Sequence, residues 1–239
     1  MIPQPQATVA ALVLYGSRAR GDSDDRSDTD VAVFTYAQSM SDLQDLKRWV
    51  TKSSMAPPDA TFAIYSTATA DRMAERGSLF LWHVRLEGRV LYDHDKWLAG
   101  LWQRHTRFSR SHALDSIQIV EMVVDDVTNA LRQSPATAAF EGATLFSMLR
   151  TLGMVLGQAI GKPAFGRRSA VDLLRSTLRD EFTLTSTQVR QLEVARLEYA
   201  GKIDSSGSAE SPDYLAPALQ IKKMLGPIRH CLDLEAAQW

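Results

Sequence analysis

Apolar runs and polar, glycine-bounded segments alternate over residues 1–94 of the chain. Residues 8–15 form a continuous apolar run that closes at a glycine, which is typical of a strand buried on both faces. After a polar segment, residues 28–34 predict a second strand, and residues 59–65, which follow two prolines, predict a third. The N-terminal part of the chain is therefore expected to contain a sheet.

Helical patterns connect and follow these strands. Ser41 and Gln44 have the spacing of a capping box, and apolar residues follow them at helical intervals, so a helix is predicted to begin there. Residues 70–85 have helical composition, and residues 89–93 predict a short fourth strand at the edge of the sheet.

Beyond residue 95 the apolar positions recur every three or four residues, which is typical of helices that pack together. Helices are predicted over residues 114–131, 137–160, 167–180, 186–200 and 213–235, with a polar loop at 201–212. The predicted fold is an α/β (α+β) domain with a short mixed sheet over 1–94, followed by an all-α helical bundle over 95–239.

Composition narrows the classes of protein to consider. A chain of 239 residues and 26.5 kDa is long enough for two domains with proper cores. The formal charge of −1 argues against a broad nucleic-acid surface. The single cysteine, Cys231, excludes an internal disulfide, and no apolar run is long enough to cross a membrane. Residues 7–15 make a poor signal peptide, so a cytoplasmic protein without a membrane partner is expected.

Candidate phosphate-binding residues lie directly after the first predicted strand, in the segment Gly16-Ser17-Arg18-Ala19-Arg20-Gly21. Glycine lets the backbone approach a ligand closely, and backbone N–H groups together with the Ser17 hydroxyl could hold phosphate oxygens. Arg18 and Arg20 add guanidinium groups that suit the delocalised charge of a phosphate. We expect Gly16, Ser17, Arg18 and Arg20 to bind a nucleotide.

Two carboxylates follow on the second predicted strand. Asp28 and Asp30 lie on the same face, because side chains alternate along a strand. Neighbouring carboxylates repel each other unless a hard cation lies between them, and Mg²⁺ is usually bound by one or two carboxylates together with substrate phosphates. Asp59, which opens the third strand, could supply a third ligand. The pattern predicts a two-metal site for in-line attack on the α-phosphorus of a nucleoside triphosphate, in which Mn²⁺ could substitute for Mg²⁺.

The order Gly16-Ser17, ten residues, then Asp28-x-Asp30 resembles the signature of the DNA polymerase β superfamily, particularly its minimal nucleotidyltransferase branch. In that family the glycine-serine turn follows the first strand and the paired aspartates lie on the second. A third aspartate on a later strand completes the metal site, and Asp59 matches it by order and spacing. The resemblance implies that Asp28, Asp30 and Asp59 are the catalytic, metal-binding residues.

Residues 86–93 also resemble the stretch that closes the nucleotidyltransferase domain in this branch. The resemblance covers roughly residues 8–93, and the helical remainder is similar in outline to the substrate-binding or HEPN-type bundles that accompany such domains. Two features depart from the family. The chain has little of the helix that precedes the first strand, and no histidine follows Arg196 at the HEPN ribonuclease spacing, so ribonuclease activity is not expected.

Several of these residues also admit a purely structural interpretation. Arg18 and Arg20 could be surface charges, and Asp59 could be a turn carboxylate after the two prolines. Arg107 and His112 have the spacing of the HEPN ribonuclease motif, but they lie at the beginning of the bundle, so the match is attributed to chance. For several other groups a role in the site is weighed against a structural one. They are the loop acids Asp22, Asp24 and Asp25, the basic residues Lys162, Arg167 and Arg168, the bundle carboxylates Glu121, Asp125, Asp126 and Glu141, and the tryptophans Trp82, Trp97 and Trp102, for which packing is favoured.

The sequence thus predicts an enzyme of the nucleotidyltransferase class (EC 2.7.7). It would transfer a nucleoside monophosphate, AMP from ATP, to a hydroxyl of a protein or RNA and release pyrophosphate, in the manner of toxin–antitoxin or defence systems. One alternative is O-adenylylation of a small hydroxylated antibiotic of the aminoglycoside or lincosamide type. Another is a catalytically silent module that senses nucleotides or binds a partner. The acceptor and a homo-oligomeric state are left open.

Overall fold

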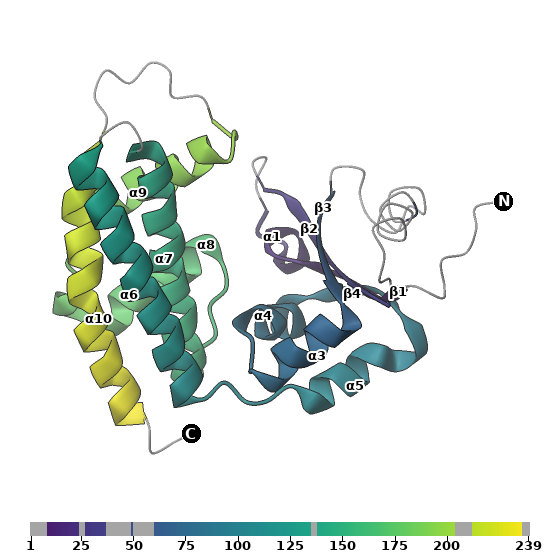
Figure 1. Ribbon diagram of the computed structural model, residues 1–239. Coiled ribbons are helices and arrows are strands. Elements are labelled where there is room, and N and C mark those ends of the chain that lie inside the picture. Colours follow the sequence, from purple (N-terminus) through teal and green to yellow (C-terminus); the bar gives the residue numbers. More distant parts are fainter. Residues whose placement is uncertain are drawn as a thin grey trace. The chain divides into compact units, whose positions relative to one another are not determined.

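The computed structural model describes residues 9–23, 27–36, 49, 60–134, 138–203 and 212–235. The chain divides into two compact units, Met1–Phe108 and Ser109–Trp239 (Figure 1). The predicted boundary between residues 94 and 95 lies earlier than this division, because a further helix belongs to the first unit. Apart from Trp49, the helix predicted to begin at Ser41 lies outside the described residues.

The first unit contains a sheet with helices between and after its strands. Its described elements are β1 (Val9–Tyr15), α1 (Ser17–Arg20), β2 (Thr29–Thr35), β3 (Ala60–Ser66), α3 (Thr67–Glu75), α4 (Leu79–Glu87), β4 (Arg89–Asp93), the 3-10 turn η2 (His94–Lys96) and α5 (Trp97–Arg104). All four predicted strands are confirmed to within one residue.

The sheet is mixed, as predicted, with the strand order β3-β2-β1-β4. Strand β1 is antiparallel to both β2 and β4, whereas β2 and β3 are parallel. In this register Tyr15 lies opposite Asp30, and Asp30 in turn lies opposite Thr61. Strand β1 lies between β2 and β4, and its run of apolar residues contributes to a buried cluster on each face of the sheet.

The helical stretch predicted over residues 70–85 is two helices rather than one. Helix α3 ends at Glu75 and α4 begins at Leu79. The chain leaves α3 through two backbone hydrogen bonds, from the Gly77 N–H to the Ala74 carbonyl and from the Ser78 N–H to the Met73 carbonyl. A glycine followed by this pair of bonds is a common way to end a helix.

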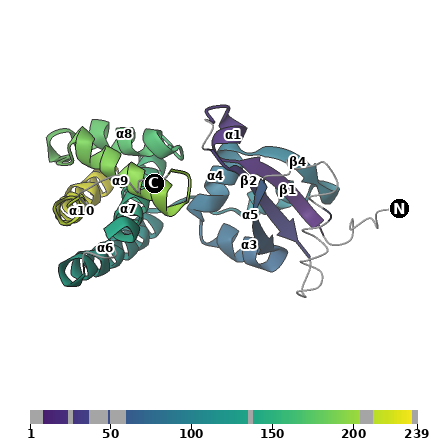
Figure 2. The ribbon, with the colours of Figure 1, turned by 90° about the horizontal axis from the view of Figure 1, so that it is seen from above.

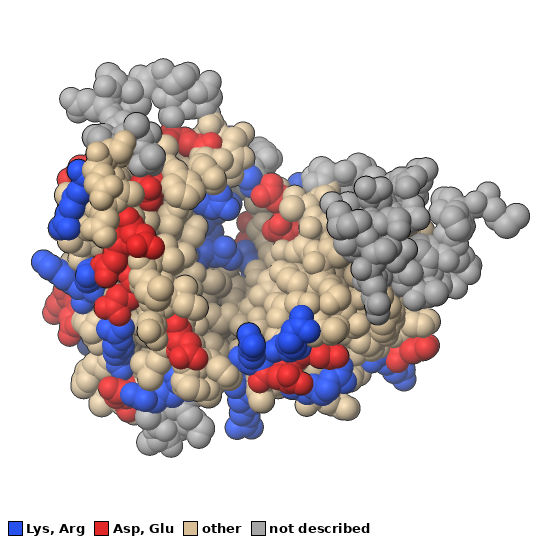
Figure 3. Space-filling view, in the orientation of Figure 1, with Lys and Arg blue, Asp and Glu red and all other residues tan. Residues whose placement is uncertain are grey.

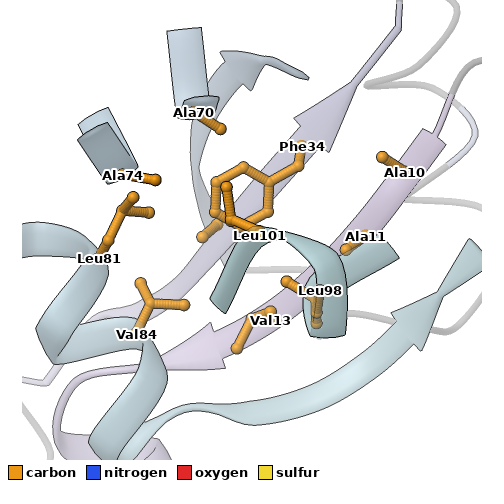
Figure 4. Close-up of a cluster of buried hydrophobic side chains, with 11 residues drawn as sticks. Ala10, Ala11, Val13, Phe34, Ala70, Ala74, Leu81, Val84, Leu98 and Leu101 are labelled. Atoms are coloured by element: carbon orange, nitrogen blue, oxygen red, sulfur yellow. The ribbon is translucent and has the colours of Figure 1, made fainter. Parts of the chain in front are cut away.

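Helices α3, α4 and α5 cover one face of the sheet. Figure 4 shows Phe34 of β2 surrounded by Leu81 and Val84 of α4 and by Leu98 and Leu101 of α5. The opposite face of the sheet has its own buried cluster: Val9, Leu12, Leu14, Val31 and Val33. Alternate residues of β2 thus point to two different cores, which fixes the register of the strand.

A buried histidine lies where the chain leaves α5. His105 is only 7% exposed, and its ring lies 4.7 Å from the ring of Trp82 and 6.1 Å from that of Trp102, measured between centroids. Burial, and then the positive charge of Arg85, lowers the pKa of His105 from 6.5 to about 4. The ring therefore stays neutral in the folded protein down to mildly acidic pH.

We expect His105 to make the protein less stable in acid. The unfolded chain takes up a proton at His105 below pH 6.5 while the folded chain does not, so stability is lost as the pH falls from 6.5 towards 4. The predicted loss from this residue between pH 7.5 and pH 5 is about 2 kcal/mol. Denaturant unfolding of wild type and His105→Phe at both pH values measures it. Equal pH dependence in the two proteins would contradict the prediction.

The regular elements of the second unit, within its described residues, are all helices. It contains α6 (Arg110–Gln133), α7 (Ala138–Ala159), α8 (Arg167–Leu178), the 3-10 turn η4 (Arg179–Glu181), α9 (Ser186–Tyr199) and α10 (Leu215–Glu235). The five predicted bundle helices are confirmed, and the polar loop between the last two lies largely outside the described residues. Figure 2 looks roughly along α6 and α10.

Helix α7 packs against all the other long helices of the bundle and is buried along most of its length. Glycines allow this. A Cβ at Gly153 would lie 2.1 Å from the backbone oxygen of Ala170 in α8, and a Cβ at Gly142 would lie 2.7 Å from the ring of Tyr214. The backbones of α7 and α8 can approach this closely at Gly153 only because no side chain separates them.

Ion pairs join α6 and α10 along their exposed edge. Arg110 pairs with Asp233, Lys222 with Asp125 at 2.5 Å, and Arg229 with Glu121 at 2.6 Å. Figure 3 shows acidic and basic side chains interleaved along these helices. Two of the bundle carboxylates whose role the sequence left open, Glu121 and Asp125, thus take part in helix pairing. His112 caps the start of α6 with Ser109, which gives it a structural role.

No helix in the part of the chain that the structure describes combines the length and the apolar character needed to cross a membrane.

Candidate active site

A tight turn follows β1 at the point where the sequence predicts phosphate binding. Gly16 has φ 77° and ψ −157°, a conformation that is essentially restricted to glycine. Ser17 to Arg20 then form a single helical turn, α1, in which the N–H groups of Ala19 and Arg20 both donate to the Gly16 carbonyl at 3.1 Å. Gly21 ends the turn in the left-handed conformation. The backbone conformation of the turn over residues 16–21 is therefore set by glycines at both ends and by hydrogen bonds within the turn.

The start of the turn and the Asp30 carboxylate of β2 lie close together. A Cβ placed on Gly16 would lie 3.0 Å from Oδ2 of Asp30. The cause is the pairing of β1 with β2, which sets Tyr15 opposite Asp30. Two segments separated by a long polar loop thus meet at one end of the sheet, as the sequence pattern requires.

Asp28 and Asp30 are separated by a buried residue. Thr29 is fully buried, whereas Asp30 is partly buried and Asp28 is exposed. Ala32 and Phe34 face the core beneath the helices, so strand alternation places Asp30 on that same face. Asp28 lies one residue before β2 and two positions before Asp30, so the same alternation would place it on this face as well.

Asp59 lies outside the described residues. Strand β3 begins at the next residue, Ala60, which lies opposite Thr29 in the parallel pairing. Within the described residues, which do not include Asp59, no group of three or more His, Cys, Asp or Glu side chains could hold a metal ion. Its role as the third carboxylate stays a prediction.

Comparison with known proteins bears on the same segment. Residues 2–97 match the family model described as polymerase beta, nucleotidyltransferase. This segment is a polymerase beta-type nucleotidyltransferase domain. No curated protein matches the chain. The match includes the turn, Asp28, Asp30 and Asp59, and it ends before the helical unit.

The arginines of the nucleotidyltransferase domain differ in their surroundings. Arg18 is exposed, whereas the side chain of Arg20 is only 20% exposed. Arg20 donates from Nη1 to Glu87 Oε2 at 2.7 Å and from Nε to Asp22 Oδ2 at 3.1 Å. His83 Nε2 lies 3.0 Å from the same oxygen of Glu87. We refer to Arg20, Asp22, His83 and Glu87 as the Glu87 cluster.

Opposing effects set the charges in the Glu87 cluster. Burial alone would raise the pKa of Glu87, but hydrogen bonds from His83 and Arg20 outweigh it and lower that pKa. Burial would lower the pKa of Arg20, but hydrogen bonds to Glu87 and Asp22 raise it. Glu87 and Arg20 are thus both held in their charged forms.

Glu87 and His83 were not among the site residues predicted from the sequence. Glu87 lies in the stretch 86–93 whose resemblance to the closing part of the family's domain was noted, and His83 lies one helical turn before it. The helical spacing of His83 and Glu87 predicts that they are neighbours. Their contact with Arg20, 67 positions earlier than Glu87, depends on the tertiary fold.

The donor set of this domain suits a hard divalent cation. Carboxylate oxygens are the ligands that Mg²⁺ prefers, and Asp30 presents one beside a glycine backbone, where a larger residue would fill the space. Domains of this family usually use divalent metal ions. Asp28 and Asp30 therefore fit a metal-binding role.

We expect Gly16→Ala to damage this site. The new methyl group would crowd the Asp30 carboxylate, and the backbone conformation of Gly16 is strained for any other residue, at a cost of about 1–3 kcal/mol. The control is Gly21→Ala, because Gly21 also has a positive φ but no atom beyond its two neighbouring residues would lie within 4 Å of the added carbon. Thermal unfolding and nucleotide-transfer rates of both variants test this. If Gly21→Ala lost as much activity as Gly16→Ala, contact with Asp30 would not be the cause.

Proposed function

We propose that the protein is a Mg²⁺-dependent nucleotidyltransferase of the minimal nucleotidyltransferase branch. It would transfer a nucleoside monophosphate, AMP from ATP, to a hydroxyl of a protein or RNA in the cytoplasm and release pyrophosphate. The observation that carries this proposal is the contact between the Gly16 backbone and the Asp30 carboxylate, inside a domain that matches the nucleotidyltransferase family.

In this proposal the carboxylates of Asp28, Asp30 and Asp59 hold the metal ions. When bound, the ions neutralise charge on the triphosphate and at the reacting phosphorus. The Ser17 hydroxyl, the backbone N–H groups of the turn and the exposed Arg18 bind the β- and γ-phosphates. These contacts orient the α-phosphorus for in-line attack, which accounts for a large part of the rate in such reactions.

The bond changes are those of phosphoryl substitution. The acceptor oxygen forms a bond to the α-phosphorus, and the bond from that phosphorus to the oxygen bridging to the β-phosphate breaks. Pyrophosphate leaves with that electron pair. The carboxylate of Asp59 is the group proposed to take the proton of the acceptor hydroxyl.

The first test asks whether nucleotide is transferred at all. The protein is incubated with Mg²⁺, cell lysate and each of the four α-labelled nucleoside triphosphates, with Mn²⁺ as a second metal. We expect a labelled protein or RNA band, strongest with ATP. The proposal fails if no triphosphate gives labelling, and calorimetric binding of ATP without transfer would favour a silent nucleotide-sensing module instead.

The second test separates macromolecular from small acceptors. Labelled products are digested with protease or ribonuclease, and the protein is expressed in cells exposed to a panel of aminoglycosides and lincosamides. Label that is sensitive to either digestion supports the proposed acceptor. Raised drug tolerance that is lost in Asp30→Ala would replace it with the antibiotic-modifying alternative.

A further inference from the structure

The Glu87 cluster meets the turn 16–21 at the end of α1. Arg20 is the last residue of α1 and stands directly before Gly21. Its guanidinium is bound by a carboxylate of α4 at 2.7 Å and by Asp22 at 3.1 Å. A guanidinium that already faces two carboxylates offers little net positive charge to a phosphate.

The same cluster also supports the start of the turn. The ring of His83 lies edge-on to the ring of Tyr15, with centroids 5.4 Å apart and planes at 90°. Tyr15 is the last residue of β1, directly before Gly16, and lies opposite Asp30. The Glu87 cluster therefore reaches the turn at both ends, through Tyr15 before Gly16 and through Arg20 before Gly21.

The position of Glu87 is itself fixed by packing. The next residue, Gly88, approaches β1 so closely that a Cβ there would lie 2.6 Å from Cγ1 of Val13. Glu87 and His83 have side chains that are 18% and 9% exposed. The largely buried carboxylate of Glu87, held by His83, can fix where Arg20 lies. Moving Arg20 away would leave a buried negative charge without this partner.

We propose that Glu87, supported by His83, holds Arg20 and thereby fixes the turn 16–21 in the shape that receives the triphosphate. Arg20 is then a positioning residue that acts through Glu87, and it does not bind the phosphates itself. This inference rests on the proposed nucleotide transfer for its kinetic consequence, whereas its structural consequence stands without it.

A double-mutant cycle tests whether Arg20 acts through Glu87. Arg20→Ala, Glu87→Ala and the double variant are compared in kcat and KM for the triphosphate. We expect each single variant to lower kcat/KM about ten- to a hundredfold, and the double variant to lose no more than the worse single one. The matched control is the exposed pair Arg104–Asp71, joined at 2.7 Å in the same unit, whose alanine variants should leave transfer unchanged.

Two outcomes of the cycle overturn the proposal. The first is multiplication of the two single effects in the double variant, which would mean that the residues act independently. The second is a raised KM in Arg20→Ala that Glu87→Ala does not share, as expected for a direct phosphate contact. If Glu87→Ala does not fold, Glu87→Gln takes its place, because it keeps the shape and removes the charge.

Hydrogen exchange supplies a readout that needs no activity. The N–H groups of Ala19, Arg20 and Gly21 bond to carbonyls within the turn, so their exchange reports its stability. We expect exchange over residues 16–22 to become about tenfold faster in both single variants and to stay unchanged in Asp71→Ala. If exchange is faster in the two single variants but the wild type transfers no nucleotide, only the proposed function is wrong. Unchanged exchange in Glu87→Ala would sink the positioning role, whatever the wild type transfers.

Discussion

Asp30→Asn is expected to lower the rate of nucleotide transfer about a thousandfold or more. The Asp30 carboxylate lies against the Gly16 backbone at the end of the central strand pair, where the phosphate-binding turn begins. Asparagine has nearly the same shape, so the fold is retained, but it lacks the negative charge that a divalent cation requires. Losses of this size are typical when a group that stabilises developing charge is removed.

Single-turnover rates at saturating Mg²⁺ and ATP measure the effect of Asp30→Asn, and thermal unfolding checks that the variant is folded. Asp71→Asn is the matched control, because Asp71 is an exposed carboxylate of the same unit that pairs with Arg104. The assignment of Asp30 would be wrong if the folded Asp30→Asn variant kept a tenth of the wild-type rate.

Gly153→Ala is expected to destabilise the helical bundle by about 3 kcal/mol. The added carbon would lie 2.1 Å from the oxygen and 2.6 Å from the carbonyl carbon of Ala170. These are backbone atoms, so no side-chain rotation relieves the clash, and α7 and α8 have to move apart along a packed interface. Overpacking of this kind costs about 1–3 kcal/mol and occasionally more.

Denaturant unfolding of Gly153→Ala measures this cost. Gly226→Ala in α10 is the control, because Gly226 is exposed and no atom from outside its own stretch of helix lies within 4 Å of the added carbon. That variant should change the stability by no more than about 1 kcal/mol, because the helix preference of alanine is opposed by crowding between its Cβ and the ring of Pro227, the next residue. Equal stability of the two variants would show that the α7–α8 contact tolerates a methyl group.

The sequence predicted the sheet well because its signals are local. Each strand is a short apolar run with glycine, proline or polar residues at its ends, and each bundle helix carries a three- and four-residue repeat. The break between α3 and α4 was not predicted, although Gly77 and Ser78 are residues that commonly end one helix and begin the next.

The candidate site was only partly predictable. Gly16 directly follows the first predicted strand, and Asp28 and Asp30 lie at the start of the second. If the two strands pair, the turn and the carboxylates meet at the same end of the sheet, and side-chain alternation places the two carboxylates on one face. The partner of Arg20 could not be deduced, because Glu87 reaches it only after α4 has packed on the sheet. For the helical unit, apolar spacing identifies the buried face of each helix and says nothing about which hydroxyl would accept the nucleotide.

Helix α5 bears on where such a domain can be cut or joined. Leu98 and Leu101 are almost fully buried beside Phe34, so they complete the core under the sheet although the family match ends before them. A fragment that stops at residue 94 would expose that core to water and invite aggregation. Gene fusions that give this domain a different helical partner would therefore preserve folding only when the junction falls beyond Arg104.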